Sequence, residues 1–167
     1  MVDDALNLSN VELLTPCRPS KIIGVAANFP GVSGSDDPID EPFIFVKSLN
    51  SLISDGQPIM SSFPESSVWG EPELAIVIGK RLSNASTHNA SSAIFGYSIA
   101  NDVTGLNAVG RDHHLARSKC ADSFCPLGPF IETDFNPTGK KIRGFQNGRL
   151  IRDGLLDSRI FSEGEIL

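Results

Sequence analysis

The sequence is poor in cysteine, and the few cysteines that it has follow no recognisable pattern. Cys17, Cys120 and Cys125 are an odd number and show no C-x-x-C spacing. Small disulfide-stapled domains usually carry even numbers of cysteines, and structural zinc sites carry closely spaced pairs. The sequence therefore indicates neither a disulfide framework nor a zinc site, and we expect reduced thiols in a cytosolic protein.

An excess of basic residues and long apolar runs are also missing. The chain has 14 Lys and Arg against 20 Asp and Glu, which gives a formal net charge of -6. Surfaces that bind nucleic acid or anionic membranes are usually basic. No apolar run approaches the roughly 20 residues that span a bilayer, and Met1–Asp4 is acidic, without the apolar segment of a signal peptide. We predict a cytoplasmic protein that binds neither nucleic acid nor membrane.

The length and the pattern of apolar residues predict one globular domain that is mostly β. The 167 residues suit a single domain with a sizeable core, and 40% of them are hydrophobic. Short apolar runs separated by turn residues favour an α+β domain with many strands. The expected strands are 21–27, 43–46, 74–78, 94–102 and 126–133; a hairpin over 141–151 turns at Asn147-Gly148. We expect a helix over 106–119, a capping box that opens a helix at Ser162, and irregular chain over 28–42, 48–64 and 81–89.

The most informative stretch is Val68–Lys80, which combines two acids with a strand. The apolar run Leu74–Ile78 is closed by Gly79, which is typical of a strand buried on both faces. Because side chains alternate along a strand, Glu71 and Glu73 share one face. Such a pair either shares a proton or a cation, or it lies at a solvated strand edge where Pro72 stops the ladder.

Asp102 is a third acid that could join this pair. It ends the predicted strand 94–102, and the residues on its own face are small: Gly96, Ser98 and Ala100. A wall of small side chains leaves space for a ligand. The alternative is a helix-capping or turn aspartate, since Thr104-Gly105 follows. Three carboxylates together would favour Mg²⁺, Mn²⁺ or Ca²⁺ over zinc.

Four basic residues are further candidates, each with a simpler alternative. Lys47 and Lys119 end or border apolar segments, so each is either solvated or able to place a positive charge beside a developing enolate. Arg111 either pairs with Asp112 on a solvated helix face or reaches an anionic substrate. His113 is adjacent to another histidine, and two neighbouring helical residues cannot both face one pocket.

Several blocks of the sequence, taken in order, resemble the fumarylacetoacetate hydrolase superfamily, in particular its 2-hydroxyhepta-2,4-diene-1,7-dioate isomerase and acylpyruvase-like branch. The resemblance covers nearly the whole chain from about Pro19 onward. The matching blocks are Lys21–Val25 with Asn28-Phe29, Pro42–Lys47, Trp69–Lys80, Phe95–Thr104, Lys119 with Asp122–Pro129, and Asn147-Gly148.

The resemblance implies a fold, a metal site and a class of chemistry. It implies a mixed β-roll with short flanking helices, with residues 1–20 as a lead-in and 21–167 as the catalytic domain. Glu71, Glu73 and Asp102 correspond to ligands for Mg²⁺ or Mn²⁺, with Ca²⁺ also possible. Lys119 corresponds to a lysine that contacts the substrate oxygens, and Lys47 to one that lines the same pocket. The implied substrate is a small 2-oxo or 2-hydroxy-dienoic acid that reacts through a metal-stabilised enolate, in a homodimer.

Three departures from the family pattern modify this expectation. Val32 and Ser35 stand where hydrolytic members carry a His and a Glu that activate water. Leu106, Asn107 and Val109 replace an Arg-Asp and a Gln, so substrate selectivity would be set by Arg111 or His113. The family's last strands, with Gly-Asp and Gly-Thr-Pro motifs, do not follow, so we expect a domain that is incomplete at its C-terminus.

These departures favour an isomerase or a decarboxylase over a C–C hydrolase. An acylpyruvate or fumarylacetoacetate-type hydrolase stays an alternative. A second alternative is a truncated, non-catalytic family member that acts as a binding or subunit-interaction module.

Overall fold

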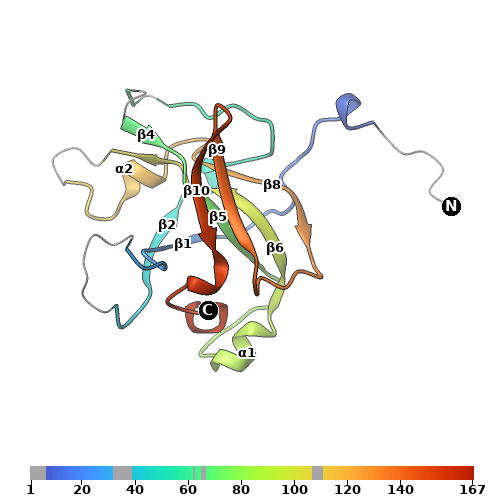
Figure 1. Ribbon diagram of the computed structural model, residues 1–167, viewed down its shortest axis with the longest axis vertical. Helices are drawn as coiled ribbons and strands as arrows, with labels where there is room; N and C mark the ends of the chain where they lie inside the picture. Colours follow the sequence, from blue (N-terminus) through green and yellow to red (C-terminus); the bar gives the residue numbers. More distant parts are fainter. Residues whose placement is uncertain (1–6, 32–38, 62, 65–66, 107–110) are drawn as a thin grey trace.

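A computed structural model describes residues 7–31, 39–61, 63–64, 67–106 and 111–167, and within these the protein is mostly β with three short helices (Figure 1). The strands are β1 Ile22–Ala26, β2 Phe43–Lys47, β3 Leu52–Ile53, β4 Val68–Trp69, β5 Pro72–Ile78, β6 Ile94–Asn101, β7 Thr104–Gly105, β8 Cys125–Glu132, β9 Lys141–Gln146 and β10 Arg149–Leu155. The helices are α1 Thr87–Ser91, α2 Ala116–Lys119 and α3 Glu163–Ile166. Single 3-10 turns lie at Leu8–Asn10, Leu49–Ser51 and Leu156–Ser158.

The largest sheet has the strand order β3-β8-β6-β5. β5 pairs with β6 and β6 with β8 in antiparallel fashion, whereas the short β3 runs parallel to β8. The other described strands form three antiparallel pairs, β1 with β2, β4 with β7, and β9 with β10. This mixture of pairings is the mixed, mostly β architecture that the sequence predicts.

Strand β6 carries its small residues inward and its large apolar residues outward. Gly96 and Ser98 are buried, whereas Phe95 and Ile99 are 54% and 51% exposed. A Cβ on Gly96 would lie 2.6 Å from the backbone oxygen of Glu132, so only glycine allows β6 and β8 to approach this closely. The predicted small-residue face is therefore the inner face of the strand, and it leads to the buried Asp102.

The hairpin of β9 and β10 turns at Asn147-Gly148, as predicted. Both residues have positive φ, 52° and 75°, which is the conformation of a type I′ turn. The hairpin crosses in front of β5 in Figure 1. A Cβ on Gly144 of β9 would lie only 2.6 Å from Pro72 of β5, which shows how tightly the two strands pack.

The C-terminal helix α3 packs against α1, at the bottom of Figure 1. The predicted capping box is present, since the backbone N–H of Ser162 donates to Glu165 Oε2 at 2.8 Å. Gly164 is buried, and a Cβ there would lie 2.6 Å from the backbone oxygen of Thr87. Among the helices that the structure describes, none has the length and apolarity needed to cross a bilayer.

Four expectations from the sequence are wrong in detail. Residues 74–78 are not buried on both faces, because β5 is the edge strand of its sheet and its side chains are only partly covered. The predicted helix over 106–119 is a turn from residue 111 onward and becomes helical only at Ala116, because Leu115 adopts a left-handed conformation (φ 57°). Residues 107–110 lie outside the described chain. The segments 48–64 and 81–89 are not wholly irregular, since they contain β3 and the start of α1.

Candidate metal and substrate site

The ends of β5 and β6 bring Glu71 and Asp102 together. Pro72 pairs with Asn101 in the strand register. Glu71, which precedes Pro72, therefore lies opposite Asp102, which follows Asn101. The backbone N–H of Asp102 donates to the backbone oxygen of Glu71 at 2.9 Å. Glu73 lies on the same edge, opposite Ala100. The three predicted metal ligands therefore emerge from one end of one strand pair.

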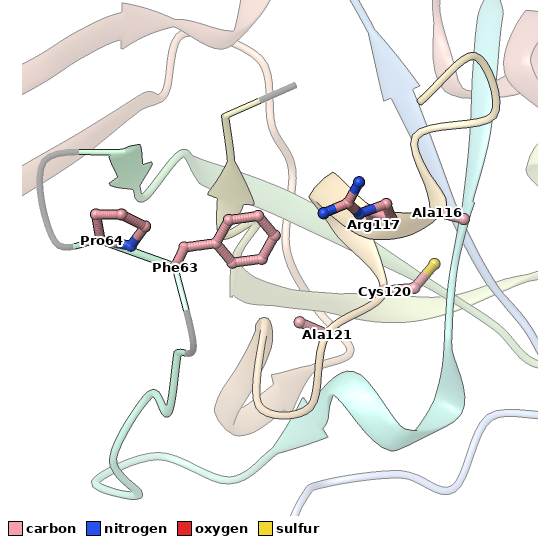
Figure 2. A pocket seen from close by; sticks show the side chains of 6 residues that line it. All are labelled: Phe63, Pro64, Ala116, Arg117, Cys120 and Ala121. Carbon is pink, nitrogen blue, oxygen red and sulfur yellow. The ribbon is translucent and has the colours of Figure 1, made fainter. Parts of the chain in front are cut away.

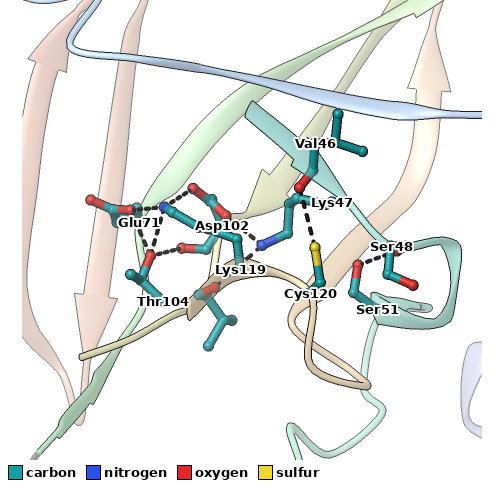
Figure 3. Close-up of polar contacts among 10 residues, drawn as sticks. Val46, Lys47, Ser48, Ser51, Glu71, Asp102, Thr104, Lys119 and Cys120 are labelled. Atoms are coloured by element: carbon teal, nitrogen blue, oxygen red, sulfur yellow. Dashed lines mark hydrogen bonds and ion pairs between the residues drawn. The ribbon is translucent and has the colours of Figure 1, made fainter. Parts of the chain in front are cut away.

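Two buried lysines reach this cluster from other parts of the chain (Figure 3). Lys47, the last residue of β2, places Nζ 2.5 Å from Asp102 Oδ1 and 3.2 Å from the backbone oxygen of Val103. Lys119, the last residue of α2, donates to Asp102 Oδ2 and also to Glu71 Oε2 at 2.8 Å. Each oxygen of the Asp102 carboxylate thus has its own ammonium partner.

Two further residues hold Lys119 and were not predicted from the sequence. The Lys119 ammonium donates to Thr104 Oγ1 at 2.7 Å, and the Thr104 hydroxyl lies 2.9 Å from Glu71 Oε2. The ring of Phe45 lies under the ammonium, 4.7 Å from Nζ to the ring centroid. Phe45 follows the alternation of β2, since it is two residues from Lys47, whereas Thr104 is the first residue of the next strand, β7, two residues after Asp102.

The charges of the cluster do not balance. Three carboxylates face two ammonium groups, and none of the ion pairs in the described part of the chain involves Glu73. Burial, and then the nearby charges of Asp102 and Glu71, raise the pKa of Glu73 to about 7. The partly buried Glu73 is therefore the acid that lacks a cation.

The ammonium of Lys119 has the opposite effect on its partners. Burial would raise the pKa of Glu71, but the hydrogen bond and charge of Lys119, with a hydrogen bond from Thr104, lower it below the ordinary value. Burial would likewise lower the pKa of Lys119, but its bonds to Asp102 and Glu71 raise it. Lys119 is thus held as a cation and Glu71 as an anion.

The donor chemistry of the three acids suits a hard divalent cation, although the acids do not enclose one in this structure. Across the described residues, no three His, Cys, Asp or Glu side chains come together closely enough to form a metal-binding cluster. The Lys119 ammonium lies between Glu71 and Asp102 instead. Carboxylate oxygens are the donors that Mg²⁺ and Mn²⁺ prefer, and Glu73 is a partly buried carboxyl group that none of the described ion pairs neutralises. The residues therefore fit such an ion in kind, and their assignment as ligands stays a prediction.

The two predicted selectivity residues are exposed side chains. Arg111 and His113 are exposed in the turn before α2. Leu106, the last described residue before 107–110 in the sequence, is 53% exposed. Val32, Ser35, Asn107 and Val109 lie outside the described residues. The roles of Arg111 and His113 therefore stay predictions.

A cavity lies between Phe63 and Pro64 on one side and α2 with the residues that follow it on the other (Figure 2). It has a volume of about 480 Å³, and its lining is largely apolar except for one cationic side chain, Arg117. The lining residues are Phe63, Pro64, Ala116, Arg117, Cys120 and Ala121. A second cavity of about 340 Å³ lies between Phe29, Pro30 and β10. None of the three acids lines either cavity.

Comparison with known proteins identifies the family. Residues 21–167 match the sequence profile described as fumarylacetoacetate (FAA) hydrolase C-terminal. The chain belongs to the fumarylacetoacetate hydrolase family. It is 37% identical over 147 residues to protein Rv2993c of Mycobacterium tuberculosis, covering 84% of this chain and 55% of that protein. It is 34% identical over 172 residues to the oxaloacetate tautomerase YisK of Bacillus subtilis, covering 96% and 57%.

Solved structures share the fold. A 5-carboxymethyl-2-hydroxymuconate delta-isomerase from Mycobacterium smegmatis superposes with a TM-score of 0.85 at 32% identity, covering 95% of this chain and 64% of that one. A maleylpyruvate hydrolase from Sphingobium sp. SYK-6, in complex with manganese (II) and pyruvate, superposes with a TM-score of 0.77 at 26% identity, covering 95% and 57%. The chain thus spans between about half and two thirds of the length of these proteins.

Proposed function

We propose that this protein is a divalent-metal-dependent enzyme that isomerises or decarboxylates a small 2-oxo or 2-hydroxy-dienoic acid through an enolate. Residues 21–167 would form its catalytic domain and residues 1–20 a lead-in. The observation that carries the proposal is that three acids at the ends of β5 and β6 lie together with two buried lysines, which are the last residues of β2 and α2. An isomerase and a tautomerase among the similar proteins support it, as does the manganese and pyruvate complex of a structural neighbour.

Each residue of the cluster has a role that follows from its contacts. Glu71, Glu73 and Asp102 would hold Mg²⁺ or Mn²⁺, with Ca²⁺ as a weaker fit, and the bound ion would supply Lewis-acid stabilisation of an enolate. Lys119 carries a charged ammonium with Thr104 as a fixed partner, so it is placed to bind a substrate oxygen that gains negative charge. Lys47 neutralises Asp102 from the opposite side and keeps its carboxylate oriented.

The chemistry of the substrate explains why isomerisation is favoured over hydrolysis. Moving a hydrogen along an enol or dienol changes only C–H and O–H bonds, so no water has to be activated. Hydrolysis of a C–C bond needs a base for water, and Val32 and Ser35 cannot supply one. An acylpyruvate or fumarylacetoacetate-type hydrolase is the alternative within the same family.

A non-catalytic role is favoured by a different observation. Lys119 already bridges Glu71 and Asp102, so the cluster could be a structural ion-pair network in a binding or subunit-interaction module. We also propose a homodimer, because strand β2 exposes three large apolar side chains, those of Phe43, Ile44 and Val46, at 57% or more. Light scattering at two protein concentrations measures the subunit number, and a monomer at both would contradict the dimer.

The test of the enzyme proposal is turnover of a substrate panel. Oxaloacetate, acylpyruvates and a hydroxymuconate-type diene are each assayed with Mg²⁺, with Mn²⁺ and after chelation. We expect metal-dependent conversion of at least one of them, reduced about 100-fold or more in Glu73→Gln. Glu132→Gln, which alters an exposed glutamate on β8, is the control and keeps full activity. Turnover that survives chelation, or that Glu73→Gln leaves unchanged, contradicts the mechanism.

A further inference from the structure

Lys119 is the last residue of a helix that is too short to be stable by itself. α2 has four residues, Ala116–Lys119. Isolated helices of this length are not stable, since one turn does not recover the cost of nucleation. Its N-cap, Leu115, has a left-handed backbone (φ 57°, ψ 18°) and makes no side-chain capping bond. Some other group must therefore fix the start of the helix.

That group is the carboxylate of Asp112, three residues before the N-cap. Asp112 Oδ1 accepts from the backbone N–H of Arg117 at 3.1 Å, and Oδ2 accepts from the backbone N–H of Ser118 at 2.7 Å. Oδ2 also accepts from the Ser118 hydroxyl at 2.7 Å. These N–H groups belong to the first turn, which has no acceptors within the helix. Asp112 therefore performs the task that an N-cap side chain usually performs.

Backbone hydrogen bonds connect Asp112 to Leu115 and Leu115 to Lys119. Leu115 N–H donates to the backbone oxygen of Asp112 at 3.0 Å, and Lys119 N–H donates to the backbone oxygen of Leu115 at 2.8 Å. Ser118, which donates two of the hydrogen bonds that Asp112 accepts, is 2% exposed and immediately precedes Lys119. The Asp112 carboxylate and the Lys119 backbone are thus joined through one compact unit.

We propose that Asp112 is a positioning residue that orients Lys119 toward Glu71, Asp102 and Thr104. Its effect on catalysis rests on the proposed function, but its effect on the Lys119 side chain does not. The three donors are served by both oxygens of one carboxylate, each of which accepts hydrogen bonds and donates none. An asparagine would turn an NH₂ group toward one of the N–H donors, so Asp112→Asn loses most of the effect.

The direct test observes the ammonium groups of Lys47 and Lys119 by lysine side-chain NMR in the purified protein. Lys47→Met and Lys119→Met assign the two signals. We expect both to exchange slowly in the original protein, because both are buried in ion pairs. In Asp112→Ala the Lys119 signal is lost and the Lys47 signal is kept. Asp157→Asn, an exposed aspartate that accepts the backbone N–H of Gly139 at 2.9 Å, is the matched control and keeps both.

Two results would overturn the proposal. If Asp112→Ala keeps both ammonium signals, Lys119 does not depend on Asp112; if it loses both while still folded, Asp112 acts on the whole domain. If Asp112→Ala does not fold, as judged by circular dichroism, Ser118→Ala takes its place because it removes only the hydroxyl bond. We then expect Lys119 exchange about threefold or more faster with Lys47 unchanged, and an unchanged Lys119 signal overturns the proposal.

A kinetic measurement follows where the substrate panel gives turnover. Asp112→Ala lowers kcat about 10- to 100-fold, because a displaced Lys119 no longer meets the developing charge, and changes KM less than threefold. Asp112→Glu recovers part of kcat, which a loss of stability alone would not explain. Equal losses in kcat for Asp112→Ala and the Asp157→Asn control contradict the proposal. Absence of turnover in the original protein refutes the proposed function and leaves the NMR result standing.

Discussion

Lys47 Nζ and Asp102 Oδ1 lie 2.5 Å apart although 55 residues separate them in the chain, and their side chains are only 3% and 5% exposed. The pair links the end of β2 to the end of β6. Burial removes both charges from water, so the contact is sustained by mutual attraction and by the bonds around it. Such a pair is sensitive to the loss of one partner.

Asp102→Asn is expected to destabilise the fold by about 3–5 kcal/mol, because it leaves the Lys47 ammonium buried without its counter-ion. Urea unfolding followed by fluorescence measures the change in the free energy of unfolding. The control Asp157→Asn alters an exposed aspartate and should stay within about 0.5 kcal/mol.

The double variant Lys47→Met with Asp102→Asn is expected to lose less than the sum of the two single variants, because neither charge is then left unpaired. Additive losses would mean that the two side chains act independently.

The stability of the metal-free protein is expected to fall as the pH rises through the range 4.5 to 7. The pKa of Glu73 is raised from 4.5 to about 7, so the folded state binds this proton more tightly than the unfolded chain does. The resulting stabilisation is fully present below pH 4.5 and is lost as the pH rises through 7, by about 3 kcal/mol for Glu73 alone.

Glu73→Gln removes this contribution. The difference in unfolding free energy between the variant and the original protein should therefore grow in favour of the variant from pH 4.5 to pH 8. Parallel pH profiles for the two proteins would show that the pKa of Glu73 is the same in the folded and unfolded states.

Mn²⁺ or Mg²⁺ is expected to stabilise the folded protein more strongly at pH 8 than at pH 5, because protons compete for Glu73. At a free ion concentration about 100 times Kd, the gain is about 2.7 kcal/mol. Thermal unfolding with and without the ion measures it. Glu132→Gln should retain the gain and Glu73→Gln should lose it; an equal gain in both variants would place the ion elsewhere.

Gly24→Ala is expected to destabilise the protein by about 1–3 kcal/mol and to disturb Lys119. A Cβ at this position would lie 2.1 Å from Phe45 Cζ, and the Phe45 ring supports the Lys119 ammonium. Gly154→Ala on β10 is the matched control, since the nearest atom to its Cβ would be 3.5 Å away. Chemical unfolding compares the two; equal and small losses would mean that the Phe45 ring moves aside without cost.

Most strands were predictable because their apolar runs are local signals. The chain segments of β2, β6, β8 and the β9–β10 hairpin appear close to their predicted limits. The short β3 was not predictable, because its two residues gain their conformation from pairing with β8. The helix over 106–119 was predicted wrongly, because the spacing of apolar residues does not reveal that Leu115 takes a left-handed backbone.

The candidate site was predictable in part. Alternation along β5 places Glu71 and Glu73 on one face, but their approach to Asp102 depends on strand register, which a single sequence does not specify. The resemblance to a family supplied that link and the two lysines. Thr104 carried no signal, since it begins a separate strand, β7, and Asp112 was interpreted as half of a solvated pair with Arg111. The bonds from the backbone of Arg117 and Ser118 to Asp112 follow no sequence motif of the kind that reveals the capping box at Ser162.

The backbone bond between Asp102 N–H and the Glu71 oxygen has a consequence for protein engineering. It holds positions 71 and 102 at a fixed separation whatever side chains they carry. The two positions could therefore carry other metal-binding side chains at the same backbone spacing. Histidine at both positions would offer nitrogen donors to a softer metal, with Lys119→Ala to make room and Lys47→Met to avoid a buried charge without its counter-ion.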